Sequence, residues 1–154
     1  MRAVVVDETG DPSVLKVRET EDPRVAPGQA RIRVAAAGVN FADVVMRRGF
    51  IPSPLPMIPG VEGAGVVESI GEGVTTLSVG DRVAWAPVMG GDGTVGSYAE
   101  LKCVDEGSLI PIPAAVSLET AAAVMLQGLT AHYLVYDKKK ICLLYTSPSP
   151  RDKT

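Results

Sequence analysis

Short runs of β-branched and apolar residues recur along the chain, and each run is closed by glycine or proline. Turn-forming stretches such as GDP at 10–12, PG at 27–28 and GEG at 71–73 separate the runs, and the chain holds 16 Gly and 12 Pro residues. Short strands at this spacing are typical of a barrel or a sandwich. The first part of the chain is therefore predicted to be mainly β, with strands over 2–6, 14–19, 30–38, 64–70, 81–87 and 97–104.

Two segments carry helix signals. In NFADVVMRRG, residues 40–49, Asn40 can cap a helix, Asp43 falls in the first turn, and a glycine follows the last turn. The second segment starts after Ser117, runs through an alanine-rich stretch and is interrupted at Gly128, after which a helical pattern resumes. The β part is thus expected to lead into a helical region.

Charge and hydropathy argue against several kinds of partner. The net charge is −3, with 15 basic and 18 acidic residues interspersed, so we expect neither nucleic acid nor an anionic membrane as a partner. The chain has no apolar run of bilayer length and no signal-peptide pattern, so a cytoplasmic location is expected. Cys103 and Cys142 lie far apart, which leaves no disulfide framework and no cysteine-rich zinc knuckle.

The spacing G-x-G-x-x-G occurs once in full, in GDGTVG at residues 91–96. Such glycines bind a pyrophosphate where a strand turns into a helix. Residues 81–88 indicate a strand upstream, but residues 97–104 alternate and are followed by Pro111 and Pro113, which oppose a helix. We expect a flexible hairpin connection here, with a dinucleotide site as the alternative.

Four stretches carry a resemblance to a known family: AAAGVNFADVVMRRG, PGVEGAGVVESIGEGVTTLSVGDRVA, GSYAE and AAAVMLQGLTAHYLV. In this order they resemble the N-terminal, GroES-like catalytic domain of the medium-chain dehydrogenase/reductase superfamily, in its zinc-free quinone oxidoreductase (zeta-crystallin-like) branch. The resemblance implies a mainly β fold, a GroES-like, partly open barrel with short helices and a C-terminal helical segment. It implies a catalytic domain over 1–126 and, over 127–137, the start of a helical link to a nucleotide-binding domain.

The same resemblance bears on metal binding. Asn40 and Val61 stand where zinc-dependent relatives have a cysteine and a histidine, and neither side chain suits zinc, so no metal is expected. Glu62 matches the glutamate of the G-x-E pattern in these relatives. Its plainest interpretation is a buried acid held by backbone groups or by a basic neighbour.

Without a metal, the resemblance implies hydride transfer from NADPH to a quinone or an enone. It places Asn40 and Asp43 near the nicotinamide and the acceptor as catalytic residues, and it assigns Asn40 and Thr130 to cofactor binding. The alternatives are helix capping alone for Asn40 and Asp43, and an ordinary helix-start hydroxyl for Thr130. Val45 and Ile51 stand where tyrosines often line the cleft of such relatives, so a more apolar acceptor pocket is expected.

The final residues depart from the resemblance. KKKICLLYTSPSPRDKT, residues 138–154, forms no glycine-rich phosphate loop, so the Rossmann domain is expected to be missing. Because LLYTSPSPRD resembles a translated sequencing adapter, this tail is expected to be non-native or disordered. His132 and Cys103 are interpreted as structural residues.

Three functions remain open on the sequence. The first is a truncated NADPH-dependent quinone oxidoreductase, itself inactive, whose intact form is a homodimer. The second is a fragment of a zinc-free enone or alkene reductase. The third is a non-catalytic GroES-like binding module, because a fold does not fix a function.

Overall fold

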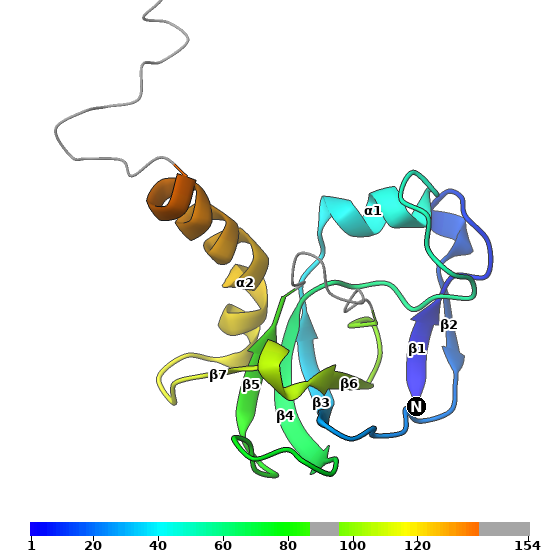
Figure 1. The fold of residues 1–154 in the computed structure, drawn as a ribbon. Coiled ribbons are helices and arrows are strands. Elements are labelled where there is room, and N and C mark those ends of the chain that lie inside the picture. Colours follow the sequence, from blue (N-terminus) through cyan, green and yellow to red (C-terminus); the bar gives the residue numbers. More distant parts are fainter. Residues whose placement is uncertain (87–95, 139–154) are drawn as a thin grey trace, which may run out of the picture.

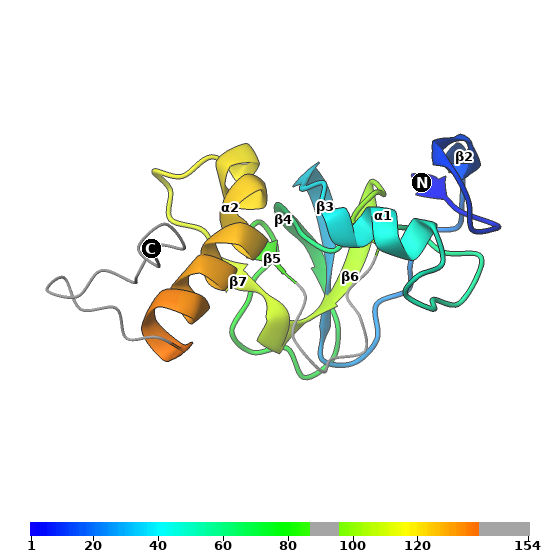
Figure 2. The same cartoon turned by 90° about the horizontal axis from the view of Figure 1, so that it is seen from above.

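The computed structural model describes residues 1–86 and 96–138, with no description of residues 87–95 and 139–154. The described residues form two β-sheets and two α-helices (Figure 1), and Figure 2 gives the view from above. Most of GDGTVG lies outside the described residues, so the hairpin expected there stays a prediction. The expected non-native or disordered tail lies outside them too, apart from its first residue.

All strand pairings in the described part of the chain are antiparallel. The smaller sheet consists of β1 (Arg2–Val5) and β2 (Lys16–Glu19). The larger sheet has the order β6-β3-β4-β5-β7, and its strands are β3 (Gln29–Ala37), β4 (Gly63–Ile70), β5 (Arg82–Trp85), β6 (Leu101–Asp105) and β7 (Ile110–Pro111). Short 3₁₀ turns lie at η1 (Pro12–Val14) and η2 (Glu106–Ser108).

The two sheets are joined by the segment that precedes β6. Strand β6 pairs with β3 up to the Arg33–Leu101 position. Before that position the chain turns to β1, where the Val4 amide donates to the Tyr98 carbonyl at 2.8 Å. The sheets therefore curve toward each other without closing, and the expected mainly β, partly open GroES-like barrel is confirmed.

Alternate residues of the strands build the main core. The indole of Trp85 is fully buried, and its Nε1 donates a hydrogen bond to Ser97 Oγ at 2.9 Å. Successive side chains of a strand point to opposite faces, so every second residue of β3 and β5 faces this core. The buried members of the cluster are Ala30, Ile32, Val67, Leu77, Val83, Trp85, Val104 and Leu109.

Helix α1 (Phe41–Arg47) forms where the sequence predicts it. Gly49 follows with a φ of 81°, a left-handed conformation that glycine adopts without steric cost. Met46 of α1 packs with Val6, Met57 and Val61 in a second apolar cluster. This cluster fixes α1 over one end of the sheets.

Helix α2 (Leu118–His132) begins after Ser117, whose side chain accepts a hydrogen bond from the Thr120 amide at 3.1 Å. Ala121 and Ala122 pack on Ala64 and Ala84, so only small side chains separate the start of α2 from β4 and β5. A π-helical turn, η3 (Tyr133–Lys138), continues the helix. Beyond Leu126 the side chains of α2 are exposed.

Two expectations about the elements are wrong. Helix α2 runs through Gly128 without a break, because one glycine costs a helix only about 1 kcal/mol among good helix formers. The strand expected over 97–104 is regular only from Leu101, since the preceding residues leave β3 to bond to β1. The division of the chain at residue 126, which falls inside α2, stays a prediction.

Candidate functional site

The N-terminus of α1 brings Asn40 and Asp43 together. Asn40 precedes the helix in an extended conformation, and its backbone N–H donates to Asp43 Oδ2 at 2.9 Å. Both residues are buried, with exposed fractions of 8% and 5%. The two residues form a capping box, in which each side chain faces the backbone N–H of the other residue, so the capping role expected from the sequence is present for both.

The side-chain amide of Asn40 joins two distant parts of the chain. Its Nδ2 donates to Glu62 Oε1 at 2.7 Å, and its Oδ1 accepts a hydrogen bond from Gln127 Nε2 at 2.8 Å. Glu62 lies just before β4, and Gln127 lies on α2. The chain thus builds a polar network, here called the Asn40 network, from the buried residues Asn40 and Glu62 and the exposed residue Gln127.

Glu62 is the most buried member of the Asn40 network, with an exposed fraction of 1%. Its Oε2 accepts a hydrogen bond from the backbone N–H of Leu126 at 2.6 Å, so both carboxylate oxygens are paired. Gly38 leaves the space that the carboxylate fills, because a Cβ there would lie 2.6 Å from Glu62 Cδ. The expectation of a buried acid held by the backbone is confirmed.

Asp43 has a second partner. The phenol of Tyr98 donates to Asp43 Oδ2 at 2.9 Å, while Asp43 Oδ1 is buried with no partner among the described residues. Burial, followed by the hydrogen bond to Asp43, raises the pKa of Tyr98 well above its usual range. Tyr98 therefore stays protonated and acts as a hydrogen-bond donor at neutral pH.

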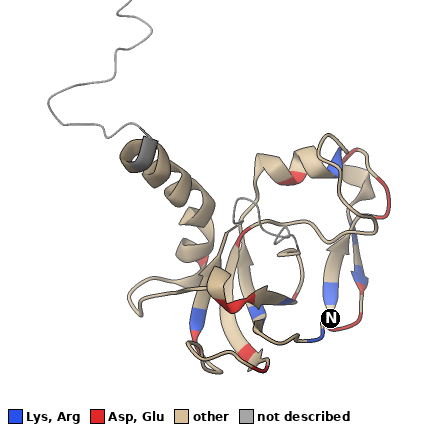
Figure 3. Ribbon diagram, in the orientation of Figure 1, with Lys and Arg blue, Asp and Glu red and all other residues tan. Residues whose placement is uncertain are grey.

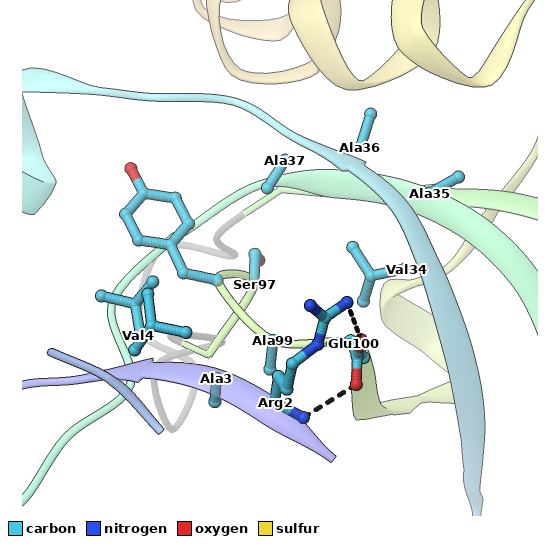
Figure 4. A pocket seen from close by; sticks show the side chains of 12 residues that line it. Arg2, Ala3, Val4, Val34, Ala35, Ala36, Ala37, Ser97, Ala99 and Glu100 are labelled. Carbon is cyan, nitrogen blue, oxygen red and sulfur yellow. Dashed lines mark hydrogen bonds and ion pairs between the residues drawn. The ribbon is translucent and has the colours of Figure 1, made fainter. Parts of the chain in front are cut away.

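Two pockets adjoin this site, one on each side of Ala36 and Ala37. The first, of about 430 Å³, lies between the end of β3 and α2, and its lining includes Glu62 and Gln127. The second, of about 330 Å³, lies between β1 and β3 (Figure 4). Tyr98 lines this second pocket together with mostly small apolar residues, and the ion pair between Arg2 and Glu100 lies at its edge.

Other residues singled out from the sequence are not members of the Asn40 network. Thr130 is exposed on α2, three residues beyond Gln127. Val61 lies in the apolar cluster with Met46. Val45 is half-buried and Ile51 is exposed. Among the described residues, no group of three or more His, Cys, Asp or Glu side chains could hold a metal ion.

His132 and Cys103 take structural positions. The ring of His132 stacks on Tyr136, with ring centroids 4.7 Å apart, on the face of the helix that the sequence indicated. Cys103 is half-buried in β6, and burial raises the pKa of its thiol, which opposes a nucleophilic role. Both observations agree with the structural interpretation.

Sequence reasoning missed Tyr98 and Gln127. Tyr98 stands in GSYAE, a stretch that carries the family resemblance, but no spacing relates it to Asp43. Gln127 directly precedes the GLT stretch in which Thr130 had been singled out. Only the fold shows that both residues contact the N-terminus of α1.

Basic and acidic residues are interspersed over both sheets, whereas α2 carries a single acidic residue, Glu119, and no Lys or Arg (Figure 3). Within the described residues, no helix is both long enough and apolar enough to cross a membrane.

The fold and the site define a family. Residues 26–114 match the alcohol dehydrogenase GroES-like domain, and the chain belongs to this family. The expected placement in the N-terminal domain of the medium-chain dehydrogenase/reductase superfamily, on the quinone oxidoreductase side, is confirmed by its relatives.

Three relatives illustrate this placement. A quinone oxidoreductase of Pseudomonas aeruginosa is 44% identical over 127 residues, covering 82% of this chain and 38% of the relative. The crystal structure of Escherichia coli quinone oxidoreductase complexed with NADPH is 33% identical with a TM-score of 0.83, covering 91% of this chain and 41% of that one. A 2-haloacrylate reductase of Burkholderia sp. is 36% identical over 146 residues, covering 90% of this chain and 42% of the relative. The chain thus spans about two fifths of the length of the curated relatives it matches.

Proposed function

We propose that this chain is the N-terminal domain of an NADPH-dependent quinone oxidoreductase that transfers hydride from the nicotinamide to a quinone without a metal. The observation that carries the proposal is the Asn40 network, which places buried polar groups beside a pocket between β3 and α2. The quinone oxidoreductase relatives, including one with NADPH bound, support the same activity.

The described residues fit one end of the cofactor. The pocket between β3 and α2 combines small apolar side chains with the polar groups of Glu62, Glu119 and Gln127, and Lys and Arg are absent from its lining. Such a lining suits the uncharged carboxamide of a nicotinamide rather than phosphate groups. NADPH, when bound, would supply a hydride, which carries two electrons and one proton, and a second proton from water would complete the hydroquinone.

The residues of this chain then orient and shield the reactants. Asn40 supplies a hydrogen-bonding group, and Asp43 holds Asn40 in place through its backbone N–H. Tyr98 in turn holds Asp43. The alanines at the end of β3 keep the pocket wall apolar, which excludes water from the path of the hydride. Thr130 adds a hydroxyl on the cofactor side in this proposal.

A metal-free reaction is consistent with the side chains at the two family zinc positions. Asn40 has its amide committed to Glu62 and Gln127, and Val61 contributes only an isopropyl group to an apolar cluster. Neither offers the thiolate or imidazole that zinc prefers. A quinone is electron-poor enough to accept hydride without a Lewis acid, so positioning and hydrogen bonding are sufficient.

The test joins residues 1–138 to the remaining, C-terminal part of the Pseudomonas aeruginosa relative and follows NADPH oxidation with 1,4-benzoquinone. We expect the fusion protein to oxidise NADPH with the quinone and to keep this activity after dialysis against a metal chelator. Asn40→Ala should lower turnover about 100-fold while lowering the free energy of unfolding by about 1–3 kcal/mol, because Glu62 Oε1 loses its partner.

Gln29→Ala is the matched control, because it removes a side-chain amide that bonds to Asp105 at the far end of β3. This variant should keep full turnover. Normal activity per folded molecule in Asn40→Ala would contradict the catalytic role and leave Asn40 a structural residue.

The similarity to a 2-haloacrylate reductase favours an alkene reductase as the second candidate function. The same fusion protein distinguishes the two, since faster turnover of 2-chloroacrylate than of benzoquinone would support the alkene reductase. Absence of turnover with either acceptor, together with ring-sized assemblies of the chain, would support a non-catalytic binding module instead.

A further inference from the structure

We infer that Glu62 is a positioning residue that turns the carbonyl oxygen of Asn40 toward α2, so that the site selects a ligand that donates a hydrogen bond. In this structure Gln127 donates a hydrogen bond to that oxygen, and a ligand can displace it. The inference rests on the proposed function for the identity of its ligand, the carboxamide of a nicotinamide.

The orientation of the Asn40 side-chain amide follows from the backbone N–H of Leu126, which can only donate a hydrogen bond. The backbone N–H of Leu126 donates to Glu62 Oε2 at 2.6 Å, and Glu62 Oε1 lies 2.7 Å from Asn40 Nδ2. A reversed Asn40 amide would set two acceptor oxygens against each other at that distance. Asn40 therefore directs its NH₂ toward Glu62 and its carbonyl oxygen toward α2.

Glu62 has no room to adopt another orientation. Its exposed fraction is 1%, and the backbone of Gly38 closes one side of its carboxylate. The Gly38 N–H also donates to the Glu62 carbonyl, at 3.3 Å. The carboxylate is thus a fixed acceptor, and it passes a fixed orientation to Asn40 as an outer-shell group does for a metal ligand.

Gln127 is suited to exchange with a ligand. It is exposed on α2 and lines the pocket between β3 and α2, and its Nε2 donates to Asn40 Oδ1. A nicotinamide carries the same primary carboxamide as a glutamine side chain, with two N–H donors. One amide donor can replace the other at Asn40 without leaving the buried oxygen unpaired.

Glu62→Gln reverses the polarity of this arrangement while keeping its shape. The Leu126 N–H keeps its acceptor when the new amide oxygen takes the place of Glu62 Oε2. The new amide NH₂ then faces Asn40, which must turn its own oxygen inward to accept. In the variant, Asn40 should present an NH₂ group at the position that Gln127 Nε2 now faces, so the advantage of a donating ligand should disappear.

The experiment titrates the isotopically labelled 154-residue chain with nicotinamide and with 3-acetylpyridine, which has a similar ring and carbonyl but no N–H donor, and follows the side-chain amide signals of Asn40 and Gln127 by NMR. Nicotinamide should bind about tenfold more tightly than 3-acetylpyridine. Glu62→Gln should abolish that ratio. The matched control is Glu68→Gln, a substitution in β4 at a residue that pairs with Arg31 and Arg33 away from the pocket, and it should keep the ratio.

A second variant keeps the inference testable if Glu62→Gln fails to fold. Gln127→Ala changes an exposed residue and removes the competing donor, so nicotinamide should bind roughly threefold or more tightly and should still bind more tightly than 3-acetylpyridine. Equal binding of the two probes to the unmodified chain would overturn the inference, and so would a ratio that Glu62→Gln leaves intact. An absence of nicotinamide effects on the Asn40 amide would overturn it as well.

These outcomes are separable from those of the proposed function. An active fusion protein with no preference for the donating probe would keep the quinone oxidoreductase and reject the role of Glu62. The preference without NADPH-dependent turnover would keep the role of Glu62 and reject the activity.

Discussion

Gly38 is the residue on which the position of the Glu62 carboxylate depends. Any side chain at this position would overlap the carboxylate, and the carboxylate has no exposed space into which it could move. Its two hydrogen bonds, to Asn40 and to the Leu126 N–H, would shift with it. The Asn40 network therefore depends on glycine at position 38, because even the methyl group of an alanine would displace the carboxylate.

Gly38→Ala should lower the free energy of unfolding by about 1–3 kcal/mol, the usual range for overpacking a buried site. Chemical denaturation followed by Trp85 fluorescence gives the measurement. Gly107→Ala is the control, because a Cβ at Gly107 meets nothing within 4 Å. A similar loss in both variants would mean that Gly38 has no special relation to Glu62.

Tyr98→Phe tests the phenol that holds Asp43. Loss of this hydrogen bond should lower the free energy of unfolding by about 1–2 kcal/mol near pH 7. The folded-state pKa of Tyr98 is raised by burial and by Asp43, so its contribution is fully present below the ordinary phenol pKa of about 10 and is lost as the pH rises through the raised value.

The difference in stability between the unmodified chain and Tyr98→Phe should therefore be constant from about pH 6 to 9 and become smaller above about pH 10. Denaturant titrations across this range measure it, with Tyr136→Phe, a change at an exposed tyrosine, as the control. A difference that grows with pH would contradict the assigned direction of the shift.

Only part of this site could be predicted from the sequence. Asn40 and Asp43 are three residues apart at a helix start, so local spacing was enough to relate them. Tyr98 is 55 residues from Asp43, and Gln127 is 87 residues from Asn40. No local pattern relates residues at such separations, because their contact depends on how β1, β3 and α2 are arranged in three dimensions.

At the scale of elements, α2 departs most from the sequence-based expectation. Glycine was expected to interrupt the helix because of its low helix propensity, yet residues 118–132 form one continuous α-helix. Burial of Ala121 and Ala122 against β4 and β5 anchors its first half. Tertiary packing thus outweighs the local preference of one residue.

Gly128→Ala should raise the free energy of unfolding by about 0.5–1 kcal/mol, because a Cβ at this position meets nothing within 4 Å and alanine favours the helix. Thermal unfolding followed by circular dichroism measures the change. Ala131→Gly, an exposed position one turn further along α2, should give an opposite shift of similar size. An unchanged stability in both variants would indicate that α2 is broken near Gly128 after all.

Strands were predictable in proportion to their length. The long strands β3 and β4 were found within about a residue of their observed ends, since apolar residues and turn signals frame both. Strand β7 consists only of Ile110–Pro111 and was missed, because two residues carry no periodicity. The segment before β6 was assigned to a regular strand, but its hydrogen bonds are divided between two sheets.

At the scale of the whole molecule, the sheets and α1 form one body, and the second half of α2 leads away from it (Figures 1 and 2). This second half and η3 expose several large apolar side chains, which are Leu129, Tyr133, Leu134, Val135 and Tyr136. An apolar surface of this kind favours association in water.

The chain should therefore show concentration-dependent self-association in sedimentation velocity experiments. Combined Leu129→Glu and Leu134→Glu substitutions should shift it toward the monomer, because two charges on this surface oppose burial. A control with Phe50→Glu and Val79→Glu changes two even more exposed apolar residues elsewhere and should not have this effect. Monomers at all concentrations, or equal effects of both pairs, would contradict a role for the end of α2.

The hydrogen bond between the Leu126 amide and Glu62 joins residues that are synthesised at different times on the ribosome. Glu62 leaves the exit tunnel 64 residues ahead of its partner, at a time when β3 and β4 can already pair. Until α2 emerges, the carboxylate has one side open to water, and it becomes enclosed only when the helix docks. A nascent chain stalled before this point would hold the strands of the core but not the wall that α2 contributes to the pocket between β3 and α2.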